Sequence, residues 1–187
     1  CNHRVSLPDG YGEIHVPQVS FNVIYILSHL YRHIFTEGIG LRQLLDYYYV
    51  LVKWHTDLTN LTDSNKSLPR MTQINTDLDT LRHELKYLGL WKFAQAVMFV
   101  MKEVFGLSED RMIAPMDEKE GSFLLDEIMR GGNFGQYDDR MGSKVGESKI
   151  HRYFRMNLRN LRFVKHYPTE ALSEPLFRTW FAVWKKI

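Results

Sequence analysis

Two histidines stand four residues apart in the first strongly apolar segment of the chain. His29 and His33 flank Arg32, and on a helix this spacing points both imidazoles to one side, as helical metal ligands require. No acidic residue completes a His-Glu-x-x-His or His-Asp motif beside them. The histidines could instead pack on the helix surface or pair with Asp46, and we favour that interpretation over a metal site.

A basic and an acidic residue follow at the start of the next apolar segment. Arg42 and Asp46 are spaced to form a helix ion pair, while Arg42 near the helix N-terminus could instead help hold an anion. With His29, Arg32 and His33 they form what we name the polar cluster, within an otherwise apolar helical hairpin. Burying such groups without partners would be costly. The polar cluster therefore indicates either a binding site or a paired structural network.

The strongest local charge signal is a row of arginines near the C-terminus. Its members are Arg152, Arg155, Arg159 and Arg162. Their spacing of three, four and three places them on one stripe of a helix, opposite an apolar face. Such a stripe could face nucleoside phosphates, a polyanion or an acidic domain, although a solvated helix face is the commoner explanation. No aromatic residue shares this face, so we do not expect a nucleic-acid partner.

A glycine-rich segment, residues 131–146, holds Asn133, Asp139 and Arg140. It lacks Walker spacing, a Gly-Lys-Ser/Thr ending and a preceding strand, so its likeness to a phosphate-binding loop is superficial. Its glycines let the backbone adopt conformations closed to other residues. We predict a flexible loop here.

Apolar residues repeat at intervals of three and four along most of the chain, which predicts an all-α fold. About seven helices are expected, over residues 20–37, 41–52, 74–88, 91–105, 123–129, 150–164 and 172–184. The segment 91–105 is apolar nearly all round, as expected of a central helix that its neighbours surround. Residues 1–19 are expected to form an extended lead-in without a strand ladder, and residues 57–70 a second flexible loop.

Length and composition limit the class of protein. A chain of 187 residues with 44% hydrophobic and 25% charged residues is typical of a single globular domain. The formal net charge is only +2, which gives no general case for binding nucleic acid or a membrane surface. The single cysteine, Cys1, forms no internal disulfide, so a reducing, cytoplasmic location is expected. The sequence also contains no apolar run long enough to span a membrane.

Four stretches of the sequence resemble one protein family. Residues 21–51, 88–107, 121–140 and 159–184 look like the C-terminal half of an uncharacterised bacterial nucleotidyltransferase family, related to the polymerase-β-like superfamily. The features that match are the two histidines with Arg32, the Arg42–Asp46 pair, and the Gly-Asn-Phe-Gly run followed by Asp139 and Arg140.

This resemblance implies that the chain is the C-terminal region of a longer protein. In the family an N-terminal domain carries the Gly-Ser turn and Asp-x-Asp strand that bind the metal and the nucleoside triphosphate. The expectation is a helical accessory or acceptor-binding region whose partners are that catalytic domain and a nucleotide or small acceptor. We expect no cofactor in this chain, and Mg²⁺ with a nucleoside triphosphate for the full-length enzyme. The alternatives are a non-catalytic binding module for a protein or anionic ligand, and a helical metallohydrolase built on His29, His33 and Asp46.

Overall fold

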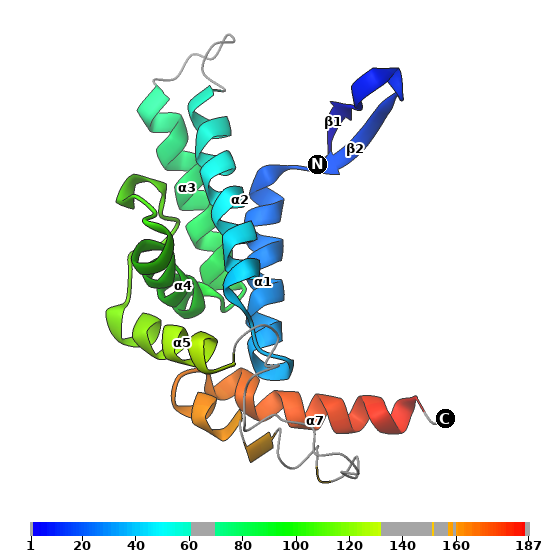
Figure 1. The fold of residues 1–187 in the computed structure, drawn as a ribbon, viewed down its shortest axis with the longest axis vertical. Helices are drawn as coiled ribbons and strands as arrows, with labels where there is room; N and C mark the ends of the chain where they lie inside the picture. Colours follow the sequence, from blue (N-terminus) through cyan, green and yellow to red (C-terminus); the bar gives the residue numbers. More distant parts are fainter. Residues whose placement is uncertain (1, 61–69, 132–150, 152–156, 159, 186–187) are drawn as a thin grey trace. The chain divides into compact units, whose positions relative to one another are not determined.

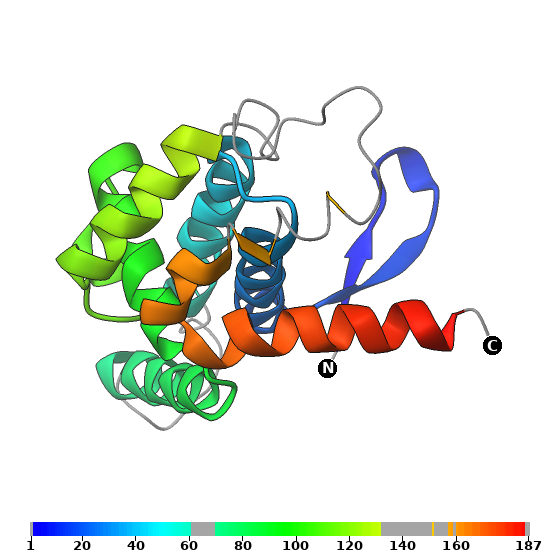
Figure 2. The same ribbon diagram turned by 90° about the horizontal axis from the view of Figure 1, so that it is seen from below.

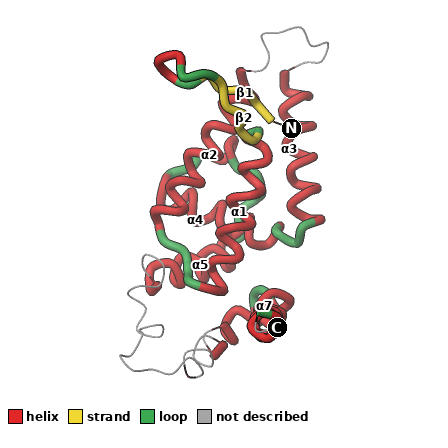
Figure 3. The backbone as a smooth tube through the Cα atoms, turned by 90° about the vertical axis from the view of Figure 1, so that its right-hand side faces the viewer, coloured by secondary structure: helices red, strands yellow, loops and turns green. Residues whose placement is uncertain are grey.

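The computed structural model describes residues 2–60, 70–131, 151, 157–158 and 160–185 (Figure 1). Within this part of the chain the regular secondary structure is helical apart from one β-hairpin, as the ribbon in Figure 2 and the tube in Figure 3 show. The predicted all-α class is therefore confirmed. The strands are β1 (Asn2–Ser6) and β2 (Glu13–Pro17), and the α-helices are α1 (Val19–Thr36), α2 (Leu41–Asn60), α3 (Arg70–Tyr87), α4 (Trp91–Phe105), α5 (Glu118–Gly131) and α7 (Pro168–Trp184).

The chain divides into two compact units. The first comprises Cys1–Leu30 and Gln43–Leu124, and the second comprises Tyr31–Arg42 and Leu125–Ile187. Helices α1, α2 and α5 each contribute to both units.

Helix α4 supplies the core of the first unit. Seven of its fifteen residues are buried, and Phe93, Val97 and Met101 are fully inaccessible to solvent. Gly106 ends the helix with a φ of 68° and donates its N–H to the carbonyl of Lys102, a left-handed cap that glycine adopts without strain. The expected central apolar helix is therefore present with the predicted bounds.

The predicted absence of strand pairing was wrong for the lead-in. Strands β1 and β2 pair antiparallel, with Val5 opposite Ile14. The connection turns through the 3-10 helix η1 (Pro8–Gly10), where Asp9 and Gly10 have φ values of 58° and 75°. An Asp-Gly pair between two strand-forming segments is a strong hairpin signal because both residues tolerate positive φ.

Helix α5 begins five residues before its expected start. The carboxylate of Asp117 accepts the backbone N–H of Glu120 at 3.0 Å, which satisfies one of the unpaired donors of the first turn. Gly121 then packs so closely against Phe99 of α4 that an added Cβ would overlap that ring. The cap sets where α5 begins, and the glycine lets α5 approach α4.

The second unit has a core of four aromatic rings. Tyr31 and Phe35 lie at the end of α1 and pack edge-to-face on each other, with centroids 5.3 Å apart. They meet Phe163 and Tyr167 edge-to-face as well, with centroids 5.4–6.1 Å apart. Edge-to-face packing of this kind favours the contact of the positive ring edge with the negative ring face. The buried Asn160 donates its Nδ2 to the carbonyl of Phe35 at 2.8 Å, and so satisfies an acceptor of the last turn of α1.

Other predicted segments have different bounds in the structure or lie partly outside the described residues. The segment expected to be a loop over residues 57–70 contributes its first four residues to α2 and its last to α3, and residues 61–69 lie outside the described part. The predicted helix over residues 150–164 is described only at 151, 157–158 and from 160, and it ends as the 3-10 helix η5 (Leu161–Lys165). The predicted loop at 131–146 lies outside the described residues from 132 onward.

Candidate functional site

The polar cluster predicted from the sequence lies at the surface of the protein. Arg32, Arg42 and Asp46 are exposed. The predicted Arg42–Asp46 pair is not among the ion pairs that the described residues form. The burial cost expected from the sequence therefore does not arise for Arg32, Arg42 and Asp46, whereas the side chain of His33 is only 20% exposed.

The two histidines have separate local partners. His29 is exposed and stacks on the ring of Tyr25, with centroids 6.3 Å apart. The Nδ1 atom of His33 lies 3.6 Å from a carboxylate oxygen of Glu37, one turn further along the chain. Among the described residues no three His, Cys, Asp or Glu side chains gather as a metal would require. We assign Mg²⁺ to none of the described residues.

The arginine row is described only at its last member. Arg162 pairs with the carboxylate of Glu127 at 2.6 Å, and their side chains are only 23% and 9% exposed. Arg162 also lies over the ring of Phe163, 5.2 Å from its centroid. It is therefore held within the second unit by a partly buried ion pair. The other predicted site residues, Arg152, Arg155, Arg159, Asn133, Asp139 and Arg140, lie outside the described residues.

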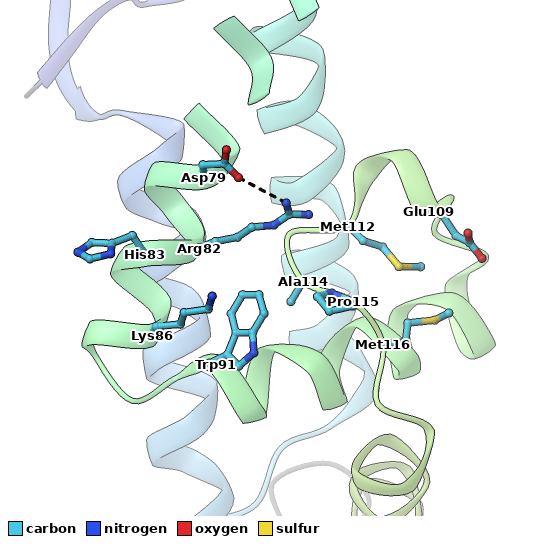
Figure 4. Close-up of a pocket in the computed structure, with 10 residues that line it drawn as sticks. All are labelled: Asp79, Arg82, His83, Lys86, Trp91, Glu109, Met112, Ala114, Pro115 and Met116. Carbon is cyan, nitrogen blue, oxygen red and sulfur yellow. Dashed lines mark ion pairs between the residues drawn. The ribbon is translucent and has the colours of Figure 1, made fainter. Parts of the chain in front are cut away.

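A cleft in the first unit brings together charged residues that the sequence analysis did not select. Helix α3 contributes four residues of one helix face, which lie at positions 79, 82, 83 and 86. Trp91, the first residue of α4, lies next to them, and residues 109–116 after α4 form the opposite wall (Figure 4). We call this site the cationic cleft. It is lined by Asp79, Arg82, His83, Lys86, Trp91, Glu109, Met112, Ala114, Pro115 and Met116.

Arg82 connects the two walls of the cleft. Its Nε donates to the carbonyl of Ile113 at 3.2 Å, and its Nη1 lies 3.6 Å from the carboxylate of Asp79. Ile113 is fully buried, so without this hydrogen bond its carbonyl would be a buried acceptor with no donor, which costs free energy. A guanidinium has five N–H donors, and these two contacts leave donors of Arg82 available to a ligand.

Lys86 and Trp91 form the second cationic element. The Nζ of Lys86 lies 4.7 Å from the centroid of the Trp91 ring, a cation–π contact that contributes about 0.5–1 kcal/mol at an exposed site. Within the described part of the chain, Lys86 forms no ion pair with an acidic residue. Figure 4 shows Arg82, Lys86 and Trp91 pointing into the same space, whereas His83 points away.

The acidic residues of the cleft are already matched by cations. Glu109 accepts a hydrogen bond from Lys102 at 2.6 Å, and this bond, with the charge of Lys102, lowers the pKa of the Glu109 carboxyl. Asp79 is paired with Arg82. Lys86 therefore supplies a positive charge that no acidic lining residue offsets.

The opposite wall is apolar over residues 112–116. Met112 and Ala114 are buried, and Pro115 and Met116 complete a surface that a flat ring or an alkyl group could cover. The cleft has a volume of about 820 Å³, within the usual range for small-molecule sites. The arrangement suits a ligand with an anionic end and an apolar body.

The sequence carried a signal for this site. Arg82 and Lys86 are four residues apart and share one face of a helix, and Trp91 follows directly after the turn. The opposite wall begins at Glu109, 23 positions after Lys86, so the cleft itself could not be predicted from local spacing.

Helix α7 carries a separate exposed surface. Four rings, those of Phe177, Trp180, Phe181 and Trp184, stack along it, and each is at least 44% exposed. In the part of the chain that the structure describes, no helix is both long and apolar enough to cross a membrane.

Comparisons with known proteins do not identify the chain. No protein-family model matches it, and neither the curated proteins nor the solved structures contain a match.

Proposed function

We propose that this chain is a helical nucleotide- or acceptor-binding region of a nucleotidyltransferase-like enzyme, and that the cationic cleft holds the phosphates of the ligand. The observation that supports this most directly is the convergence of Arg82 and Lys86 on one cleft. The resemblance of the sequence to a nucleotidyltransferase family favours a nucleotide over other anions. The transfer chemistry is assigned to a separate catalytic domain that supplies the metal-binding carboxylates.

The electrostatics of the cleft favour a phosphate group. A guanidinium and an ammonium both donate charge-assisted hydrogen bonds to phosphate oxygens, each contributing about 1.5–3 kcal/mol. The contact with Trp91 holds the ammonium of Lys86 at the cleft, so less side-chain entropy is lost when a ligand binds. The apolar wall at Met112 and Met116 would cover one side of a base or an acceptor.

Calorimetric titration with ATP tests the proposed binding. We expect Lys86→Met to weaken binding at least tenfold, because one charge-assisted contact is lost. Lys119→Met is the matched control, since Lys119 is an exposed lysine on α5 outside the cleft. Equal affinities of the wild type and the Lys86→Met protein would contradict the proposal.

Ligand fragments separate phosphate recognition from base recognition. Inorganic tripolyphosphate should bind and should lose affinity in the Lys86→Met protein, whereas adenosine should bind far more weakly than ATP. Adenosine binding as tightly as ATP would show that the cationic residues do not recognise the ligand.

The proposal assigns no catalysis to this chain by itself. The purified chain, incubated with Mg²⁺ and a nucleoside triphosphate, should release no pyrophosphate above the buffer rate. Release that depends on the protein would show that it carries its own reactive site.

A further inference from the structure

A second and larger cleft lies in the first unit, between the β-hairpin and helices α1, α2 and α3. Its volume is about 1090 Å³. The N-terminal half of α1 and the C-terminal half of α2 line it together, so the two helices run antiparallel there. Its apolar lining includes Val5, Val16, Phe21, Ile24, Tyr49 and Trp54. We call this site the apolar groove.

The β-hairpin presents an apolar face that is only partly covered. Val5 and Ile14 stand directly opposite each other in the strand register, and they are 39% and 43% exposed. The other face carries the exposed ion pair between Arg4 and Glu13, at 3.7 Å. A two-stranded hairpin is only marginally stable without further packing. Because Val5 lines the apolar groove, an occupant of the groove would provide that packing.

The rims of the groove on α1 and α2 are aromatic and exposed. Phe21 is 56% exposed and Tyr49 is 62% exposed. The ring of Phe21 stacks on Tyr25 one turn along α1, with centroids 5.8 Å apart. Large rings held in this way at the edge of a concave surface are the residue types that anchor protein partners.

One side of the groove carries negative charge. Asp77 and Glu84 of α3 both line it, and among the described residues neither forms an ion pair. They are seven residues apart on one helix face, about 10.5 Å along the axis. The third acidic residue, Asp57, is matched by Lys53 at 3.6 Å. Two negative charges that no described residue matches therefore adjoin an apolar surface.

We propose that the apolar groove binds an amphipathic basic α-helix of a protein partner. Apolar side chains of that helix would pack on Phe21, Tyr49 and the hairpin face at Val5. Two lysines or arginines seven residues apart would face Asp77 and Glu84, because two turns of the bound helix have the same rise as two turns of α3. This is the helix-in-groove form of recognition, with charge complementarity setting the register of the bound helix.

A designed peptide provides the test. The peptide has eighteen residues, leucines along one face, two lysines seven positions apart beside that face, and a fluorescein label. We expect saturable binding by fluorescence anisotropy, weakened about tenfold in the Asp77→Asn/Glu84→Gln protein and reduced at high salt. Glu103→Gln is the control, since Glu103 is an exposed acid on α4 outside the groove and this change should leave the affinity unaltered.

Four results would overturn the proposal. The first is that the peptide does not bind, and the second is that a peptide with glutamates in place of the lysines binds as tightly as the original peptide. The third is that the Asp77→Asn/Glu84→Gln protein binds the peptide as tightly as the wild type does. The fourth is that the protein forms a concentration-dependent dimer that excludes the peptide. Circular dichroism of each variant verifies that its helices are intact. The Lys86→Met protein should bind the peptide as the wild type does, so failure here is distinguishable from failure of the proposed nucleotide site.

Discussion

Replacing Tyr47 by phenylalanine should change how the stability of the protein responds to alkaline pH. Tyr47 is fully buried in α2, and its hydroxyl has no hydrogen-bond partner within the described part of the chain. Burial raises the pKa of this phenol far above its ordinary value, because the phenolate would have to leave water. The folded protein therefore keeps the Tyr47 proton at pH values where the unfolded chain releases it.

The size of the effect follows from proton linkage. An unfolded tyrosine ionises with a pKa of about 10, so at pH 11 its ionisation favours the unfolded state by about 1.4 kcal/mol. The free energy of unfolding therefore keeps its full value below pH 10 and falls as the pH rises above 10. Tyr31, whose pKa is raised by burial and by its hydrogen bond to Glu170, adds a similar loss. Tyr47→Phe removes only the first of these two contributions.

Urea unfolding followed by circular dichroism at pH 8 and pH 11 measures this difference. Between pH 8 and pH 11 the free energy of unfolding should fall in both proteins. The fall should be about 1.4 kcal/mol smaller in the Tyr47→Phe protein than in the wild type. At pH 8 the variant should be as stable as the wild type or up to about 1 kcal/mol more stable, since an unpartnered hydroxyl is removed.

Tyr49→Phe is the control for this experiment. It makes the same substitution on the same helix at a side chain that is 62% exposed, and it should follow the wild type at both pH values. If Tyr47→Phe also follows the wild type between pH 8 and pH 11, then Tyr47 ionises in the folded protein and the reasoning from burial is wrong.

Three further substitutions test the packing of the two units by urea unfolding. Gly121→Ala should destabilise the protein by about 1–3 kcal/mol, because the new methyl group overlaps Phe99. As the control, Gly131→Ala meets no atom of the described residues and should cost less than about 0.5 kcal/mol. Asp117→Ala should cost about 1 kcal/mol through loss of the α5 cap, and serine at the same position should recover most of it. Asn160→Ala should cost about 1–3 kcal/mol, because it leaves a buried carbonyl unpaired. A Gly121→Ala, Asp117→Ala or Asn160→Ala protein as stable as the wild type would contradict the role given to that residue.

The helices could be predicted from the sequence because apolar spacing is a local property. The bounds of α4 follow from its continuous apolar residues, with Gly106 as the left-handed cap. The start of α5 was also encoded locally. Asp117 with Glu120 three positions later is a capping pattern, and it was missed because the apolar residues begin only at Phe123.

The β-hairpin was missed because its apolar residues are few. Period-two alternation covers only Val5 on one strand and Ile14 and Val16 on the other, too little to identify strands by pattern alone. The turn itself was the stronger signal, since Asp9 and Gly10 both adopt positive φ.

The cationic cleft could be predicted only in part. The spacing of Arg82 and Lys86 on one helix face is visible in the sequence. Their proximity to Ile113 and Met112 depends on how α3 packs beside the segment after α4, a tertiary contact that no local pattern contains. Conversely, the polar cluster attracted attention because it lies between apolar residues, yet the structure exposes Arg32 to water.

Nuclear magnetic resonance during titration with ATP tests the central proposal most directly. The protein has four tryptophans, and only Trp91 lies in the cationic cleft. Binding in the cleft should produce saturable shifts of the Trp91 indole N–H and of the amides at residues 82–91 and 112–116, while the indoles of Trp180 and Trp184 stay unchanged. Shifts that leave Trp91 unaffected, or an unchanged spectrum at saturating ATP, would contradict the assignment of the cleft as a nucleotide site.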